Sequence, residues 1–132
     1  MKETFVKSDV KDIPARPLTE QEYGWLREIL ETSEEWRDAD IGNTRVIAEG
    51  PCDQGISFLL QAPAPENPRQ PCGASYIGRL VICTADDSMI EVRLNQSDGR
   101  LRELFVLFVD PKHPHRGLPA TWTEVSHDAI AM

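Results

Sequence analysis

The sequence predicts an α+β fold in which one N-terminal amphipathic helix packs on one face of an antiparallel meander of about five strands. Three observations predict this fold. A capping signature at Thr19 precedes apolar residues at helical spacing. Apolar and polar residues alternate after Ser88, as in a half-buried strand. The Asp98-Gly99 pair between two extended runs is typical of a hairpin, because glycine accepts the positive φ that the turn requires.

The first elements are an arm and a helix start. Residues 1–16 mix charges with isolated apolar side chains, which predicts a flexible or docked arm. Thr19 can accept a hydrogen bond from the amide of Glu22, and the Glu22 side chain can accept one from the amide of Thr19, which is a capping box. Leu18 and Tyr23 have the spacing of a hydrophobic staple.

The helix is predicted from its apolar stripe, which consists of Tyr23, Leu26, Ile29 and Leu30, with Trp25 beside it. Burying such side chains contributes about 1.5–3 kcal/mol each, which exceeds the roughly 1 kcal/mol that Gly24 costs. The polar residues 33–43 that follow predict an irregular segment ending in a turn.

Five extended runs predict the strands, at residues 44–49, 55–61, 74–83, 88–95 and 101–109. Gly78 is expected to mark a bulge in the third strand. Apolar side chains of both parities in the last strand predict cover on both faces. Residues 62–71 contain four prolines and predict an exposed loop, and residues 121–125 predict a short closing strand or a docked tail.

Length and composition predict a single domain over residues 1–132, with the arm at 1–16, a core at 17–119 and a C-terminal tail at 120–132. No apolar run has the length of a membrane span, and the N-terminus lacks an apolar signal-peptide core, so we expect a cytoplasmic protein that does not bind membranes. Cys52, Cys72 and Cys83 are an odd number of cysteines and predict free thiols that are small buried side chains.

The charge of the chain is −8 and is concentrated in one segment. Residues 19–41 contain eight acidic and two basic side chains. Such a field repels nucleic-acid phosphates and favours encounter with a basic protein surface. We therefore expect a protein partner and no nucleic acid, while an acidic helix that only keeps the protein soluble is the alternative interpretation.

Catalytic and metal-binding motifs are weak. His113 and His115 are the best pair of candidate metal ligands, but they have neither a Cys-x-x-Cys motif nor a second pair at ligand spacing. The chain contains no Gly-x-Ser-x-Gly elbow and no phosphate-binding loop. We therefore predict no catalytic residue, no metal and no cofactor. A small enzyme with an unrecognised carboxylate or His/Cys site is the alternative.

Three segments and a proline-bearing end also form a recognisable pattern. They are Arg16-Pro17-Leu18-Thr19-Glu20-Gln21-Glu22, Asp53-Gln54-Gly55-Ile56-Ser57-Phe58 and Val92-Arg93-Leu94-Asn95 with Asp98-Gly99-Arg100-Leu101-Arg102-Glu103-Leu104, followed by Leu118-Pro119. Over roughly residues 16–119 this pattern resembles a small bacterial family of compact domains of unknown function. That family is similar in size and character to the acidic immunity proteins that bacteria make beside their toxins.

The charge and the resemblance together predict a non-catalytic, acidic binding protein, most concretely an immunity-type inhibitor that covers a basic bacterial toxin domain. Its carboxylates would steer the encounter and exposed tryptophans would anchor the contact. The predicted contact residues are Glu28, Glu31, Glu34, Glu35, Trp36, Asp38, Asp40 and Trp122. A structural or accessory domain that self-associates through residues 101–109 is a further alternative, so either a monomer or a homodimer is expected.

Overall fold

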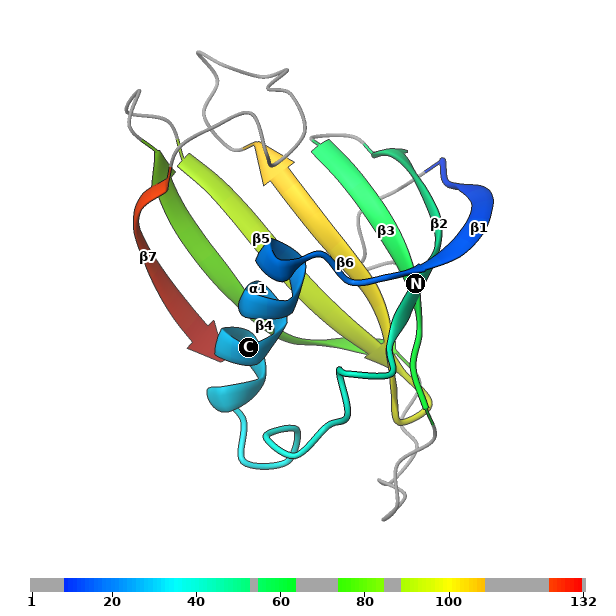
Figure 1. Ribbon diagram of the computed structural model, residues 1–132. Helices are drawn as coiled ribbons and strands as arrows, with labels where there is room; N and C mark the ends of the chain where they lie inside the picture. The colour runs from blue at the N-terminus through cyan, green and yellow to red at the C-terminus, as the bar shows by residue number, and fades with distance from the viewer. Residues whose placement is uncertain (1–8, 53–54, 64–73, 85–88, 109–123, 132) are drawn as a thin grey trace.

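A computed structural model describes residues 9–52, 55–63, 74–84, 89–108 and 124–131. These residues form one helix on one face of a seven-stranded sheet whose strand order is β1-β2-β3-β6-β5-β4-β7 (Figure 1). All neighbouring strands are antiparallel. The elements are β1 (Lys11–Pro17), α1 (Glu20–Glu31), β2 (Arg45–Cys52), β3 (Gly55–Gln61), β4 (Ala74–Thr84), β5 (Met89–Ser97), β6 (Arg100–Phe108) and β7 (Glu124–Ala131).

The predicted α+β class is confirmed, and each of the five predicted strands is present as one of β2 to β6. The sheet is larger than expected because both predicted flanking segments contribute an edge strand. Part of the predicted arm forms β1, and the predicted tail contains β7, which begins at Glu124 and overlaps the expected closing strand at residues 121–125 only at its end. Prolines at positions 14 and 17 favour an arm in the sequence. An edge strand tolerates them because its outer side has no neighbouring strand, so the missing N–H donor of a proline breaks no hydrogen bond there.

The meander topology is not observed. β1, β2 and β3 are consecutive neighbours, and so are β6, β5 and β4, but β3 pairs with β6 rather than with β4. The expectation assumed a short turn between successive strands, whereas residues 62–73 connect β3 to β4. This longer connection lets the chain pass β6 and β5 before it pairs again.

The predicted capping box at the start of α1 is confirmed. The Thr19 hydroxyl accepts from the Glu22 amide at 3.1 Å, and a Glu22 carboxylate oxygen accepts from the Thr19 amide at 2.9 Å. The same carboxylate accepts hydrogen bonds from both terminal nitrogens of Arg16, at 2.9 and 3.0 Å. The helix start is therefore joined to the end of β1.

The buried face of α1 differs from the predicted stripe by one position. Trp25, Leu26, Ile29 and Leu30 are buried as expected, whereas Tyr23 is 43% exposed and Glu22 is 4% exposed. The bidentate contact with Arg16 explains this rotation, because it satisfies a carboxylate that would be costly to bury alone. Together with Trp36, Ile41 and apolar residues of the sheet, this face forms the core.

We expect Thr19→Ala to lower the free energy of unfolding by about 1 kcal/mol, because the Glu22 amide loses its hydroxyl acceptor at the start of α1. The melting temperature should fall by roughly 3–5 °C in a thermal scan followed by circular dichroism. Thr19→Ser keeps the hydroxyl and should remain within about 0.5 kcal/mol of the natural protein. Equal losses in both variants would contradict a capping role.

The predicted hairpin at Asp98-Gly99 is confirmed. Both residues have positive φ, 53° and 86°, as in a type I′ turn, and Ser97 pairs with Arg100 across it. In β6, Leu104 and Val106 on one parity and Phe105 and Leu107 on the other are buried, as predicted. Because residues 103–107 pair with β3 and residues 103–108 pair with β5, this strand has no free edge there for the self-association that was the alternative.

Candidate functional site

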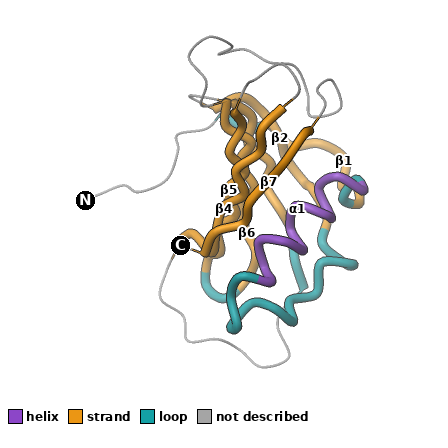
Figure 2. The backbone as a smooth tube through the Cα atoms, turned by 90° about the vertical axis from the view of Figure 1, so that its left-hand side faces the viewer, coloured by secondary structure: helices purple, strands orange, loops and turns teal. Residues whose placement is uncertain are grey.

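Most of the predicted contact residues lie on one surface, formed by the end of α1 and the turns that follow it. We call this the acidic surface, and it consists of Glu28, Glu31, Glu34, Glu35, Asp38 and Asp40. Five of these side chains are exposed and Glu28 is half-buried. Figure 2 shows α1 and the loop after it on the same side of the sheet. The fold therefore keeps the negative charge together on one side of the molecule.

Trp36 does not serve as the exposed anchor that the sequence suggested. Its side chain is 7% exposed and lies in the hydrophobic core with Ile41, which is 3% exposed. Successive turns hold the backbone between them, with the Trp36 amide donating to Ser33 at 3.1 Å and the Ala39 amide donating to Trp36 at 3.0 Å. Two buried side chains thus fix an otherwise polar segment to the core. Trp122, the other predicted anchor, lies outside the described residues.

Asp40 has a local structural contact within the acidic surface. Its carboxylate accepts from the side-chain nitrogen of Asn43 at 2.9 Å and from the Asn43 amide at 3.3 Å. The side-chain hydrogen bond from Asn43 is the main reason that the pKa of Asp40 lies below its usual value. This carboxylate therefore helps to close the turn that leads into β2.

The position of the remaining charges is unfavourable for the helix. Glu28 and Glu31 lie in the last turn of α1, which contains no basic residue, and the helix dipole is negative at that end. The exposed Arg27–Glu31 pair, at 3.5 Å, compensates little. Glu34 and Asp38 form no ion pair with any residue in the described part of the chain. Glu34 and Asp38, which lie just past this end of α1, therefore lower stability, whereas Asp40 closes a turn.

A second candidate region is the place where β3 and β6 separate within the sheet. Their pairing runs from Gly55↔Leu107 to Leu59↔Glu103 and then stops, although β3 continues to Gln61 and β6 begins at Arg100. Beyond Leu59 the two strands pair only with their outer neighbours, β2 and β5. We call the gap between residues 60–62 and 100–102 the strand split.

Bulges in the two flanking pairings lie at the same level as the strand split. In β2, Val46 pairs with Leu60 and Ala48 pairs with Leu59, so Ile47 is the extra residue. In β6, Leu101 pairs with Gln96 and Glu103 pairs with Asn95, so Arg102 is the extra residue. A bulge redirects a side chain and commonly lies next to a binding site.

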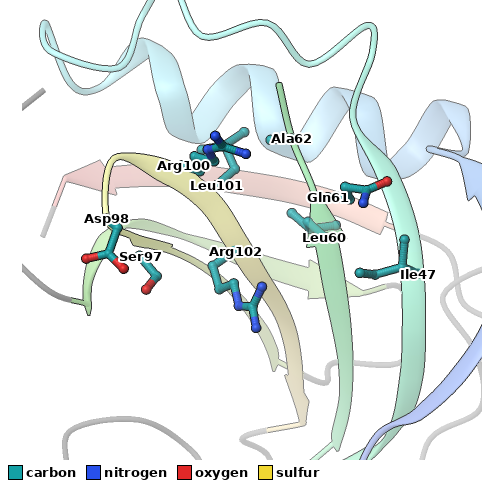
Figure 3. Close-up of a pocket in the computed structure, with 9 residues that line it drawn as sticks. All are labelled: Ile47, Leu60, Gln61, Ala62, Ser97, Asp98, Arg100, Leu101 and Arg102. Carbon is teal, nitrogen blue, oxygen red and sulfur yellow. The ribbon is translucent and has the colours of Figure 1, made fainter. Parts of the chain in front are cut away.

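The strand split holds a pocket of about 460 Å³, drawn in Figure 3. Its described lining consists of Ile47, Leu60, Gln61, Ala62, Ser97, Asp98, Arg100, Leu101 and Arg102. Both bulged residues, Ile47 and Arg102, belong to this lining. A second exposed arginine, Arg100, also lines the pocket. The pocket therefore combines apolar walls with positive charge, in a chain whose net charge is −8.

A buried carboxylate, Glu91 on β5, lies on the sheet face opposite α1 and is 5% exposed. Its two oxygens accept from Arg79 and Arg93, each at 2.9 Å. Burial opposes ionisation of this carboxyl, but the hydrogen bonds and charges of the two arginines outweigh burial, so its pKa is lowered. The Arg93 guanidinium carbon also lies 5.5 Å from the centre of the Tyr76 ring. Glu91 thus contacts both arginines, and Arg93 also contacts Tyr76, which is typical of a cluster with a structural role.

The remaining predicted chemistry falls partly outside the described residues. His113, His115, Cys72 and most of the proline-rich loop lie in the undescribed segments. Within the described part, no group of three or more His, Cys, Asp or Glu side chains is placed to hold a metal ion, and no helix is long and apolar enough to cross a membrane. Cys52 and Cys83 form no disulfide bond, as predicted, but Cys52 is half-buried and Cys83 is exposed, so neither is the buried side chain that we expected.

The strand split has no clear signal in the sequence. Its two arginines follow the Asp98-Gly99 turn, where their positions indicate only the start of the returning strand of a hairpin. The pattern Arg100-Leu101-Arg102 at the start of a strand was the one available signal, and it does not reveal a bulge.

Comparisons of the chain with protein-family models, with curated proteins and with solved structures found no match.

Proposed function

We propose that this chain is a non-catalytic binding protein whose acidic surface binds a basic protein. The proposed partner is a bacterial toxin domain, which the chain neutralises by covering its surface, as the resemblance to immunity proteins suggests. The proposal rests on one observation above all, the unfavourable position of the carboxylates at the negative end of α1. The carboxylates of Glu34 and Asp38 lie just past this end of α1 and form no ion pair within the described residues, which is typical of a surface that serves binding.

The way the acidic segment is held supports the same proposal. Trp36 and Ile41 are buried in the core, and consecutive turns connect them. A segment that is already ordered loses little conformational entropy when it binds. A fixed negative potential would also steer a basic partner and raise the association rate, most strongly at low ionic strength. No reactive group is required for inhibition of this kind.

Charge reversal at Glu34 and Asp38 tests the role of the acidic surface. We expect the double variant Glu34→Lys/Asp38→Lys to raise the free energy of unfolding by about 0.5 kcal/mol at low salt, because it removes repulsion near the negative end of α1. Urea unfolding at two salt concentrations measures the gain, which should shrink at the higher one. In the same variant, the association rate with the partner should fall by about tenfold or more at low salt.

The partner experiment uses co-expression with the product of the adjacent gene, followed by growth rescue and stopped-flow binding. A matched control is Asp12→Lys/Asp128→Lys, which changes the net charge equally at exposed positions on β1 and β7. The natural protein and this control should restore growth, and the acidic-surface variant should restore it poorly. Equal loss of binding in the two double variants would show that net charge matters and the acidic surface does not. An adjacent product that neither arrests growth nor binds would contradict the proposed partner.

A further inference from the structure

The strand split is an opening in the interior of a continuous sheet. Residues 60–61 pair with β2 on one side, and residues 100–101 pair with β5 on the other. No strand pairing joins these two stretches to each other, so their inner edges face the pocket. Figure 3 shows the β3 and β6 ribbons moving apart toward Ala62 and Arg100. Backbone donors and acceptors at such an edge are available to an incoming polar group.

Neither arginine of the pocket is paired with a carboxylate in the described part of the chain. Arg100 and Arg102 are both exposed, and neither forms an ion pair with a described residue. Arg16, Arg79 and Arg93, by contrast, each contact a carboxylate oxygen at 2.9 Å. Arg37 and Arg45 also form no ion pair with a described residue, but Arg100 and Arg102 differ from them because both line one pocket. In a protein with 22 acidic side chains, two arginines in one pocket lining indicate a place for an external anion.

The bulge at Arg102 explains why this arginine belongs to the pocket. Because Arg102 is the extra residue of β6, its neighbours Leu101 and Glu103 keep their partners on β5 while it has none. Figure 3 shows its guanidinium beside β6, whereas the Asp98 carboxylate lies on the turn, away from that group. The local backbone thus redirects a cation toward the opening, at the cost of one regular pair.

The walls of the pocket determine the kind of anion that fits. The apolar part of the lining is the half-buried Ile47 together with Leu60, Leu101 and Ala62, which are almost fully covered. An anion that also carries an aliphatic group would bury it there, while the hydrophilic groups of Gln61 and Ser97 line the rest. The net charge of −8 and the nearby Asp98 disfavour multiply charged phosphates relative to a monoanion.

We propose that the strand split is a binding site for a carboxylate attached to a short aliphatic group. The carboxylate contacts Arg102 and Arg100, and the aliphatic group lies against Ile47 at the apolar part of the lining. A free aliphatic acid and the C-terminal residue of a peptide share this chemistry. The site is separate from the acidic surface, so its test does not depend on the proposed function.

The test measures binding of defined probes to the full chain by titration followed in two-dimensional NMR. The first pair is 4-methylpentanoate and its uncharged amide, and the second is the peptide acetyl-Gly-Ala-Leu with a free or an amidated C-terminus. We expect each acid to shift the amide signals of residues 60–62 and 100–102 and to bind about tenfold or more tightly than its amide. A peptide acid that binds more tightly than 4-methylpentanoate identifies a peptide C-terminus as the source, and the reverse order identifies a free acid.

Variants then test whether the arginines are responsible. Arg102→Gln and Arg100→Gln should each weaken binding of the acids by about tenfold and leave the amides unchanged. Both side chains are exposed, so the melting temperature should stay close to that of the natural protein. Arg37→Gln removes an exposed arginine from the segment after α1 and should not affect binding.

Three results would overturn the proposal. Acids and amides of equal affinity would show that charge is not recognised. Inorganic phosphate that binds more tightly than either acid would assign a different ligand class. Shifts outside residues 60–62 and 100–102, or an absence of shifts at millimolar probe, would show that the strand split is not a carboxylate site.

Discussion

Gly55→Ala is expected to destabilise the protein by about 3 kcal/mol, at the upper end of the range for overpacking. A Cβ at Gly55 would overlap the carbonyl oxygen of Val106 on the neighbouring strand, and a backbone oxygen cannot rotate away. The clash falls within the pairing of β3 with β6, which joins the β1-β2-β3 half of the sheet to the β6-β5-β4-β7 half. Urea unfolding followed by tryptophan fluorescence measures the loss.

Gly24→Ala is the matched control for this prediction. Gly24 lies in α1, and an added Cβ meets nothing within 4 Å. Alanine restores helix propensity there and should stabilise the protein by about 0.5–1 kcal/mol. The two substitutions are chemically identical and are expected to have opposite signs. A stability close to that of the natural protein for Gly55→Ala would show that the two halves are not in close contact at this position.

Glu91→Ala is expected to destabilise the protein by about 3 kcal/mol at pH 7. The substitution removes a buried carboxylate and leaves Arg79 and Arg93 without their partner. The side chains of Arg79 and Arg93 are 39% and 28% exposed, so water partly compensates and the loss stays at the lower end of the range for a broken buried pair. Chemical denaturation at pH 7 measures the difference.

The acid dependence of stability provides the second readout for Glu91. Its pKa in the folded protein is lowered, so its contribution is present above the unfolded pKa of about 4.3 and is lost as pH falls through the folded value. Glu91→Gln, which keeps the shape without the charge, should therefore be less stable than the natural protein at pH 7. The difference should narrow steadily below about pH 4. A difference that stays constant down to pH 2 would contradict a charged Glu91 in the native state.

Elements that depend on neighbouring residues were predictable from the sequence. The capping box formed by Thr19 and Glu22 uses groups three residues apart, and the turn at Asp98 and Gly99 depends on the φ angles of two adjacent residues. The strand period was equally clear, and so was the bulge near Gly78, where the pairing of β4 with β5 shifts by one residue. These features need little information about the rest of the chain.

The candidate site was predicted only in part. The concentration of acidic residues after Thr19 is a property of the sequence, and the fold keeps these side chains on one surface. The burial of Trp36 and the exposure of Tyr23 depend on what packs beside them. A tryptophan surrounded by charged residues looks exposed in a sequence, although its ring reaches the core between α1 and the sheet. Burial of large side chains is set by contacts between distant elements.

The sequence alone determined the α+β class, the helix with its cap, five strands, the hairpin turn and the position of the negative charge, because local backbone preferences and side-chain periodicity encode them. Only the tertiary structure decided the strand order, the two edge strands and the strand split. Strand order depends on which edges find partners, and pairings such as Gly55 with Leu107 join residues far apart in the chain. The opening that exposes Arg102 arises where such a long-range pairing stops, so no local pattern records it.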